Sequence, residues 1–200
     1  MIYNRLIVAA IGFIRLEPYD GKLSRTGLRG GKDSNALLFP DYASVEMLYH
    51  PEYAGHPLIV GGDPEARHGI ILTANYTAKK KGVKTGMALW QAKMACPDLI
   101  IVPPRMDLYL KFSSMLREIY GEYTDLVEPY GCDEAWLDVT DSAILKGDGR
   151  KIAEEISWRV KKELGITVSI GISWNKIFAK LGSDYKKPAP SVNGQHLHCT

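Results

Sequence analysis

Hydrophobic residues in the second half of the chain follow two different periods. In residues 106–124 and 149–164 they recur every three or four positions, which predicts two amphipathic helices. In residues 166–173 apolar and polar positions alternate, which predicts a strand with one buried face. Shorter apolar runs predict further strands at 58–60, 70–74, 100–102, 126–128 and 135–140. Shorter helices are predicted at 42–47, 75–82, 87–96 and 174–181.

From residue 100 onward the predicted order is strand, helix, strand, strand, helix, strand. With one earlier strand, this order predicts an α+β fold built on a split βαβ, ferredoxin-like sheet with its helices on one face. Because neighbouring residues of a strand point to opposite faces, Glu134, Trp136 and Asp138 are expected to line the face left free.

The earlier strand is predicted within the apolar run 6–14, which is too short to span a membrane. The core of a signal peptide is the alternative interpretation. Arg15 and Glu17 follow the run directly and no cleavage site of small residues is visible, so the buried strand is favoured.

Composition places the chain among globular proteins. Its 200 residues are 46% hydrophobic, which allows one domain, or one and a part, with a sizeable core. The three cysteines are odd in number and widely spaced, which argues against a disulfide framework and for a reducing, cytoplasmic location.

The small net charge of +2 conceals three blocks of opposite sign. Residues 98–148 carry 11 acidic and 4 basic residues, whereas residues 63–93 carry 2 acidic and 6 basic ones, and residues 150–187 carry 4 and 9. An acidic centre between basic segments suits a cation site beside a polyphosphate or nucleic-acid track. Solvated helix faces explain the same blocks equally well.

Two adjacent acids, Asp133 and Glu134, stand between the strands predicted at 126–128 and 135–140, just after Gly131. Acids at such a position are either turn formers or ligands for a hard cation. Taken alone, the pair favours turn formers.

Over about residues 42–188 the chain resembles the Y-family (translesion) DNA polymerases, in particular the bacterial DNA polymerase IV type. The resemblance rests on four motifs in the family's order: 42–46 (YASVE), 74–76 (ANY) with 79–87 (KKKGVKTGM), 133–140 (DEAWLDVT) and 169–181 (SIGISWNKIFAKL). It implies a small fingers unit at about 47–103 and a palm at about 104–188. Residues 1–41, a divergent segment, and 189–200, a tail expected to be disordered, lie outside it.

The resemblance also implies the reaction. Y-family enzymes are DNA-directed DNA polymerases, nucleotidyltransferases that copy damaged DNA during repair. They join deoxynucleoside triphosphates to a primer–template with two Mg²⁺ ions. By the family pattern, Asp133 and Glu134 are the catalytic, metal-binding carboxylates.

Further residues of the nucleotide site follow from the same resemblance. The family places an aromatic ring at the position of Tyr42, where it blocks a ribose 2′-hydroxyl. Tyr76 and Lys79 fall where the triphosphate is held, and Lys187 falls at a further phosphate contact. The alternatives from the residues alone are core tyrosines and a solvated lysine.

Three departures from the family pattern stand out. The position of another metal-binding Asp holds Leu37, and the nearby Asp41 would need a different backbone path. Lys79 replaces the usual Arg, which keeps the charge but loses the bidentate fork. The family's thumb and its C-terminal DNA-gripping domain would follow Pro188 and are not present in these 200 residues.

We therefore expect a Y-family palm and fingers whose own activity is weak or lost. One alternative is a non-catalytic nucleic-acid-binding remnant. Another is a nucleotidyl-cyclase-like palm enzyme, against which Tyr42 and the 169–181 motif argue. A sliding clamp is a partner expected of the full-length family member, and no membrane partner is expected.

Overall fold

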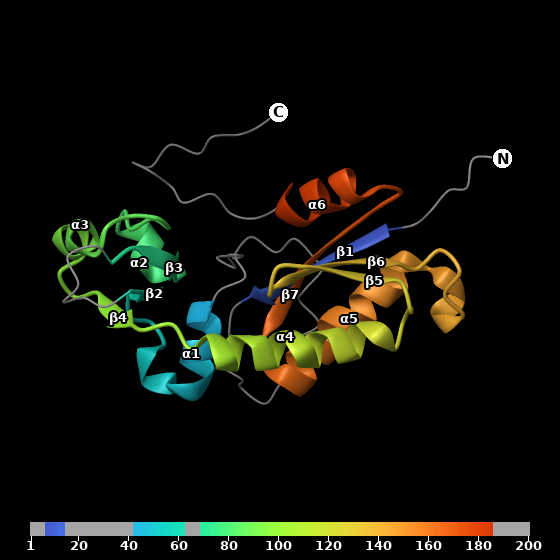
Figure 1. The fold of residues 1–200 in the computed structure, drawn as a ribbon, viewed down its shortest axis with the longest axis horizontal. Coiled ribbons are helices and arrows are strands. Elements are labelled where there is room, and N and C mark those ends of the chain that lie inside the picture. Colours follow the sequence, from blue (N-terminus) through green and yellow to red (C-terminus); the bar gives the residue numbers. More distant parts are fainter. Residues whose placement is uncertain (1–6, 15–41, 63–68, 186–200) are drawn as a thin grey trace.

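The computed structural model describes residues 7–14, 42–62 and 69–185, with the backbone alone in 7–14. Within these ranges the chain forms two sheets with helices packed around them (Figure 1). The large sheet contains β1 (Ile7–Ile14), β5 (Val127–Tyr130), β6 (Glu134–Asp138) and β7 (Thr167–Ser173). The small sheet contains β2 (Leu58–Gly61), β3 (Ile71–Ala74) and β4 (Ile100–Val102).

The large sheet has the strand order β5-β6-β1-β7, and every neighbouring pair is antiparallel. This is the order of a split βαβ sheet, so the α+β prediction is confirmed. The apolar run near the N-terminus supplies the inner strand β1, which pairs with β6 on one side and with β7 on the other. Ile11 of β1 lies opposite Glu134 of β6.

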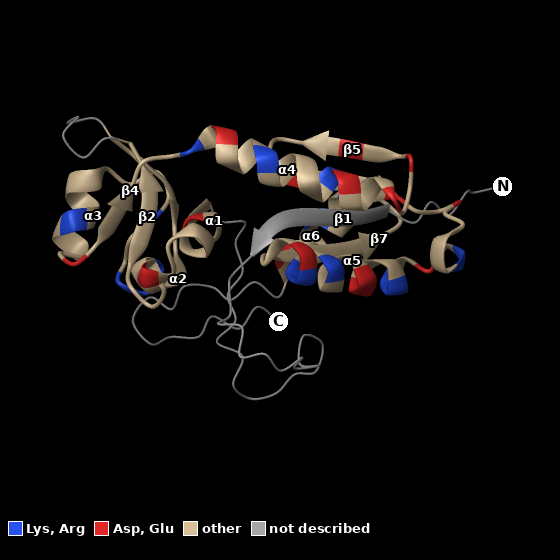
Figure 2. Ribbon diagram, turned by 90° about the horizontal axis from the view of Figure 1, so that it is seen from below, with Lys and Arg blue, Asp and Glu red and all other residues tan. Residues whose placement is uncertain are grey.

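Two long helices, α4 (Met106–Gly121) and α5 (Gly149–Leu164), cover one face of the large sheet (Figures 1 and 2). The predicted stripe of α5 is buried there: Ile152, Ile156 and Val160 have no exposed surface. Ala135 and Leu137 of β6 point into the same core. α5 begins at the cap Asp148 and ends at Gly165, whose φ of +70° suits glycine.

The other face of the large sheet carries α6 (Lys176–Tyr185), so the prediction that helices cover one face alone is wrong (Figure 1). Lys176 lies over the Trp136 ring, 5.3 Å from its centroid. Lys180 Nζ lies 2.8 Å from Glu134 Oε1. The helix reaches the sheet because Gly171 of β7 has no side chain: a Cβ there would lie 1.9 Å from Ala179 O.

The small sheet has the order β3-β2-β4, in which β2 is antiparallel to β3 and parallel to β4. Its remaining neighbours are α1 (Tyr42–Tyr49), α2 (Tyr76–Lys80), α3 (Leu89–Ala95) and the short 3-10 helix η1 (Pro51–Tyr53) beside α1. A second 3-10 helix, η2 (Ile144–Gly147), lies beside the large sheet and packs against α5. β2 is buried on both sides: Leu58 and Val60 join the core of the large sheet, and Ile59 joins the core of the small one. This strand therefore fixes the two sheets to each other.

In the part of the chain that the structure describes, every helix is too short or too polar to cross a bilayer. The segments 1–6, 15–41 and 186–200 lie outside the described residues, as do 63–68.

Candidate functional site

The two predicted catalytic carboxylates lie at the turn between β5 and β6. Figure 1 shows this turn at the end of the large sheet that faces the small sheet. Gly131 opens the turn with φ +67°, a conformation that favours glycine. Asp133 and Glu134 follow, and both side chains are half-buried. The sequence thus holds two acids at the edge between the two sheets, where a substrate can reach them.

Glu134 has a cationic partner from the other side of the sheet. Lys180 Nζ lies 2.8 Å from Glu134 Oε1, and 3.5 Å from Asp184 Oδ2 one helical turn further along α6. The ammonium group therefore neutralises part of the charge at the carboxylate turn. This contact joins α6 to the candidate site.

A third carboxylate does not accompany this pair among the described residues. β1 runs beside the turn, since Ile11 pairs with Glu134, and residues 7–14 (IVAAIGFI) contain no acid. Within the described ranges no cluster of three or more His, Cys, Asp or Glu side chains is placed to hold a metal. Leu37 and Asp41 lie outside the described residues. The described donor set therefore does not fit a two-metal centre.

Tyr42, the predicted sugar-facing aromatic, lies against the carboxylate turn. Its hydroxyl and the Sγ of Cys132, the residue before Asp133, lie 2.8 Å apart and share a hydrogen bond. The ring stacks on Tyr109 of α4, with centroids 4.3 Å apart and an interplanar angle of 11°. Burial, followed by the bond to Cys132, raises the pKa of the Tyr42 hydroxyl well above its usual range, so the phenol stays protonated.

A buried polar group that supports the Tyr42 ring was not predicted from the sequence. It consists of Glu46, Arg105 and Tyr109. Glu46 of α1 is completely buried, and its Oε1 accepts a 2.6 Å hydrogen bond from the Tyr109 hydroxyl. Arg105 donates to the same carboxylate from Nε at 3.1 Å and from Nη2 at 2.5 Å. A signal was present in the sequence: an acid inside a motif at a helix start, and an Arg–Tyr pair four residues apart at the start of another helix.

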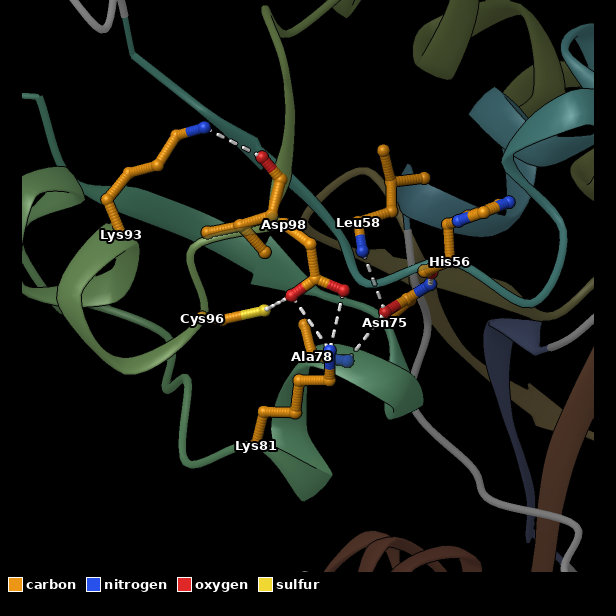
Figure 3. A network of polar contacts seen from close by, with 9 residues as sticks. His56, Leu58, Asn75, Ala78, Lys81, Lys93, Cys96 and Asp98 are labelled. Carbon is orange, nitrogen blue, oxygen red and sulfur yellow. Dashed lines mark hydrogen bonds and ion pairs between the residues drawn. The ribbon is translucent and has the colours of Figure 1, made fainter.

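Tyr76 and Lys79, the predicted triphosphate residues, both belong to α2 beside the small sheet. The side chain of Asn75 fixes the start of this helix: its Oδ1 accepts from the N–H of Ala78 at 2.9 Å and of Leu58 at 3.0 Å, as Figure 3 shows. Lys80 Nζ lies 4.7 Å from the centre of the Tyr76 ring. The local sequence thus sets the two predicted residues on a short, firmly capped turn of helix.

One lysine of the basic segment, directly after α2, already forms an exposed ion pair. Lys81 Nζ lies 2.8 and 2.6 Å from the two carboxylate oxygens of Asp98, which also accepts from Cys96 Sγ at 3.2 Å (Figure 3). These bonds lower the pKa of Asp98 and raise that of Lys81. This ion pair therefore neutralises part of the positive charge of the segment.

The basic block that begins at residue 150 is mostly a solvated helix face. Figure 2 shows Lys, Arg, Asp and Glu mixed along α5. Arg150 pairs with Glu154 at 3.0 Å, and Arg159 pairs with Glu163 at 2.7 Å, both at the i, i+4 spacing. For α5 the ordinary interpretation of the charge blocks therefore holds.

The structure thus brings Tyr42, Asp133 and Glu134 together at one edge. Tyr76 and Lys79 lie on the unit that this edge faces. Lys187 lies outside the described residues.

Comparison with known proteins identifies relatives of this arrangement. A family model described as the impB/mucB/samB family matches residues 41–184. DNA polymerase IV of Acetivibrio thermocellus is 59% identical over 147 residues, which cover 74% of this chain and 37% of the relative. DNA polymerase IV of Ralstonia nicotianae is 52% identical over 147 residues, covering 74% and 41%.

Solved structures agree with the sequence relatives. DinB from Sulfolobus solfataricus superposes with a TM-score of 0.66 at 34% identity, covering 91% of this chain and 46% of that one. The insertion ternary complex of Dbh DNA polymerase superposes with a TM-score of 0.71 at 32% identity and the same coverage. The chain spans roughly two fifths of the length of the curated relatives that it matches.

Proposed function

The chain belongs to the impB/mucB/samB family, that of the Y-family DNA polymerases, and on that premise we propose that it is the palm and fingers of a DNA-directed DNA polymerase for translesion synthesis. Its partners in this proposal are primer–template DNA and deoxynucleoside triphosphates. The observation that carries the proposal is the turn with Asp133 and Glu134, which faces the small sheet and has the Tyr42 ring beside it.

The proposed roles come from the resemblance to the family, and the positions of the described residues are compatible with them. Asp133 and Glu134 are the catalytic carboxylates, at the edge where the primer end and the triphosphate would meet. The flat, stacked ring of Tyr42 is the wall against a ribose 2′-hydroxyl. Tyr76 and Lys79 bind the triphosphate from α2, and Lys187 adds a phosphate contact.

Mg²⁺ is the ion this family chemistry needs, and the described residues supply two adjacent carboxylates for it. Because Glu134 is also paired with Lys180, this set does not fit two metal ions. We therefore propose that the 200-residue chain binds its substrates but extends a primer weakly or not at all.

Primer extension with Mg²⁺ and all four deoxynucleotides tests this proposal, run beside a binding assay with labelled primer–template. We expect binding that weakens steeply as salt rises, because backbone phosphates are neutralised by lysines. Extension should be slight or undetectable. Efficient extension that Asp133→Ala and Glu134→Ala both abolish would contradict the weak-activity proposal, and would show that an acid from residues 1–41 completes the site.

Among the described residues no third carboxylate accompanies Asp133 and Glu134, which favours one rival, a non-catalytic nucleic-acid-binding module. That rival expects DNA binding that ignores Asp133→Ala and Glu134→Ala even in the presence of Mg²⁺. A nucleotidyl-cyclase-like activity is tested separately by analysing the products of a triphosphate incubated without DNA. The three widely spaced cysteines support a cytoplasmic location for the proposed function, and a sliding clamp is a proposed partner of the full-length family member.

A further inference from the structure

The ring of Tyr42 is held at two points by residues with no role in the proposed function. One face of the ring stacks on Tyr109 with the planes 11° apart. At the far end of the ring, the hydroxyl shares a 2.8 Å hydrogen bond with Cys132 Sγ. The stacked face limits rotation of the ring about χ2, and the tethered hydroxyl limits its swing about χ1. Together the two contacts select one orientation.

The residue on which Tyr42 stacks is itself immobile. Tyr109 has no exposed surface, and its hydroxyl donates to Glu46 Oε1 at 2.6 Å. Glu46 is also fully buried, and Arg105 holds both of its oxygens. A buried carboxylate with this set of charge-assisted bonds is stiff, because losing any one bond leaves a polar atom unsatisfied. The support of Tyr42 is therefore anchored across α1 and α4.

We propose that Cys132, Tyr109 and Glu46 are positioning residues, which hold the Tyr42 ring at one angle and thereby set how strictly the site rejects a 2′-hydroxyl. This inference rests on the proposed function, in which Tyr42 faces the sugar. A steric wall discriminates only as far as it resists displacement, since a ring that can swing away admits the larger sugar at little cost.

The Cys132 contact adds a connection to the carboxylates. Cys132 directly precedes Asp133 in the turn, so the bond that fixes the Tyr42 ring also fixes the backbone next to the catalytic pair. Sugar selection and placement of Asp133 are therefore coupled through one hydrogen bond.

Nucleotide binding by the full chain with primer–template tests the proposal. The ratio of the Kd for ATP to the Kd for dATP is measured with a template thymine. We expect Cys132→Ala and Tyr109→Phe each to lower this ratio by about three- to tenfold, with a smaller change in the Kd for dATP. Cys132→Ser should restore most of the ratio, because a hydroxyl can share the bond to Tyr42.

Simple core packing makes a different forecast for the same variants. Serine and alanine are both smaller than cysteine, so a packing role expects Cys132→Ser to behave like Cys132→Ala. Tyr42→Ala distinguishes the role of Tyr42 itself from the positioning role of its neighbours. If Tyr42→Ala leaves the ratio unchanged, the proposed sugar wall fails. If Tyr42→Ala brings the ratio of the two Kd values close to one while Cys132→Ala and Tyr109→Phe leave it unchanged, the positioning role alone is overturned.

A second measurement does not depend on nucleotide binding. The rate at which iodoacetamide alkylates Cys132 is followed by peptide mass mapping, with the buried Cys96 as the internal control. We expect Tyr42→Phe to change the Cys132 rate several-fold and to leave Cys96 unreactive. The Cys132 rate falls if the lost hydroxyl donated to the sulfur and stabilised the thiolate, and rises if the hydroxyl accepted from the thiol and held its proton. An unchanged Cys132 rate in a folded Tyr42→Phe chain would overturn the contact on which the proposal rests.

Discussion

The two faces of the large sheet are held by different means. On the α4 and α5 face the contact is a continuous apolar core, in which Ile152, Ile156 and Val160 are fully buried. On the α6 face, the helix buries only Ala179 and Ser183. The large apolar side chains of α6 and of the residues just before it stay exposed: Trp174 (69%), Ile177 (72%), Phe178 (55%), Leu181 (58%) and Tyr185 (81%).

The difference shows which face stabilises the fold and which serves the site. Burial of apolar area is the dominant favourable contribution to folding, so the α5 face carries most of the stability. α6 is held by close backbone approach and by two lysines, and one of these, Lys180, contacts Glu134 of the candidate site. A helix attached in this way can be displaced without loss of the core.

The largest expected effect comes from a cavity on the α5 face. Ile156→Ala removes three carbon atoms from a side chain with no exposed surface. The free energy of unfolding should fall by about 2–5 kcal/mol, from lost burial and the cavity left behind. Urea denaturation measures this. Lys161→Ala, on the exposed side of the same helix, is the matched control and should change stability by less than about 0.5 kcal/mol. An equal loss in both variants would contradict the assignment of the core to this face.

A smaller, local effect is expected on the α6 face. A Cβ on Gly171 would lie 1.9 Å from Ala179 O and 2.4 Å from Ser183 N, so Gly171→Ala must push α6 away. The cost should be about 1–3 kcal/mol, as for other overpacking substitutions. Hydrogen exchange should speed up in α6 and not in α5.

Gly182→Ala provides the control for that experiment. Its added Cβ would meet Gly171 Cα at 3.5 Å, an ordinary contact, and alanine favours the helix. We expect unchanged or slightly slower exchange in α6. Detachment of α6 by both substitutions would argue against a specific close approach at Gly171.

The same contrast explains how much of the fold could be predicted from sequence. The α5 stripe and the alternation in β7 were readable because burial imposes a period on neighbouring residues. The position of α6 was not, because it depends on Gly171 of β7 lying against the backbone of α6, a contact between two elements that no local period records. The prediction of a helix at 174–181 was sound. The expectation that this face of the sheet stays free was wrong, because α6 covers it.

The candidate site divides in the same way. Asp133, Glu134 and Tyr42 were found through motifs, which keep catalytic residues together in short stretches. The group of Glu46, Arg105 and Tyr109 was missed, because its members are up to 63 residues apart and meet only in the fold. The roles of all the predicted site residues remain predictions: Tyr42, Tyr76, Lys79, Asp133, Glu134 and Lys187.

A third prediction concerns the ion pair that ties α6 to the site. Lys180→Met removes the 2.8 Å contact with Glu134 and keeps most of the aliphatic stem. Both partners are partly exposed, so the loss should be below about 1 kcal/mol. Thermal unfolding at low and high salt measures it, and the difference between variant and parent should shrink as salt screens the pair. A salt-independent loss would point to packing of the stem instead.

The smallest expected effect is a pH dependence at the start of α5. Asp148 accepts hydrogen bonds from the N–H groups of Arg150 at 3.1 Å and Lys151 at 3.2 Å, and its carboxylate pairs with the Lys151 ammonium at 3.1 Å. The Lys151 side chain first, then these backbone bonds, lower the pKa of Asp148. Because the folded pKa lies below the unfolded one, the stabilisation is complete above the unfolded value of about 3.9 and is lost as pH falls through the folded value. Asp148→Asn keeps a capping oxygen but cannot titrate. Between about pH 6 and pH 2 the Tm of the parent should therefore fall further than that of Asp148→Asn. Parallel curves of Tm against pH would show that the cap stabilises the helix without its charge.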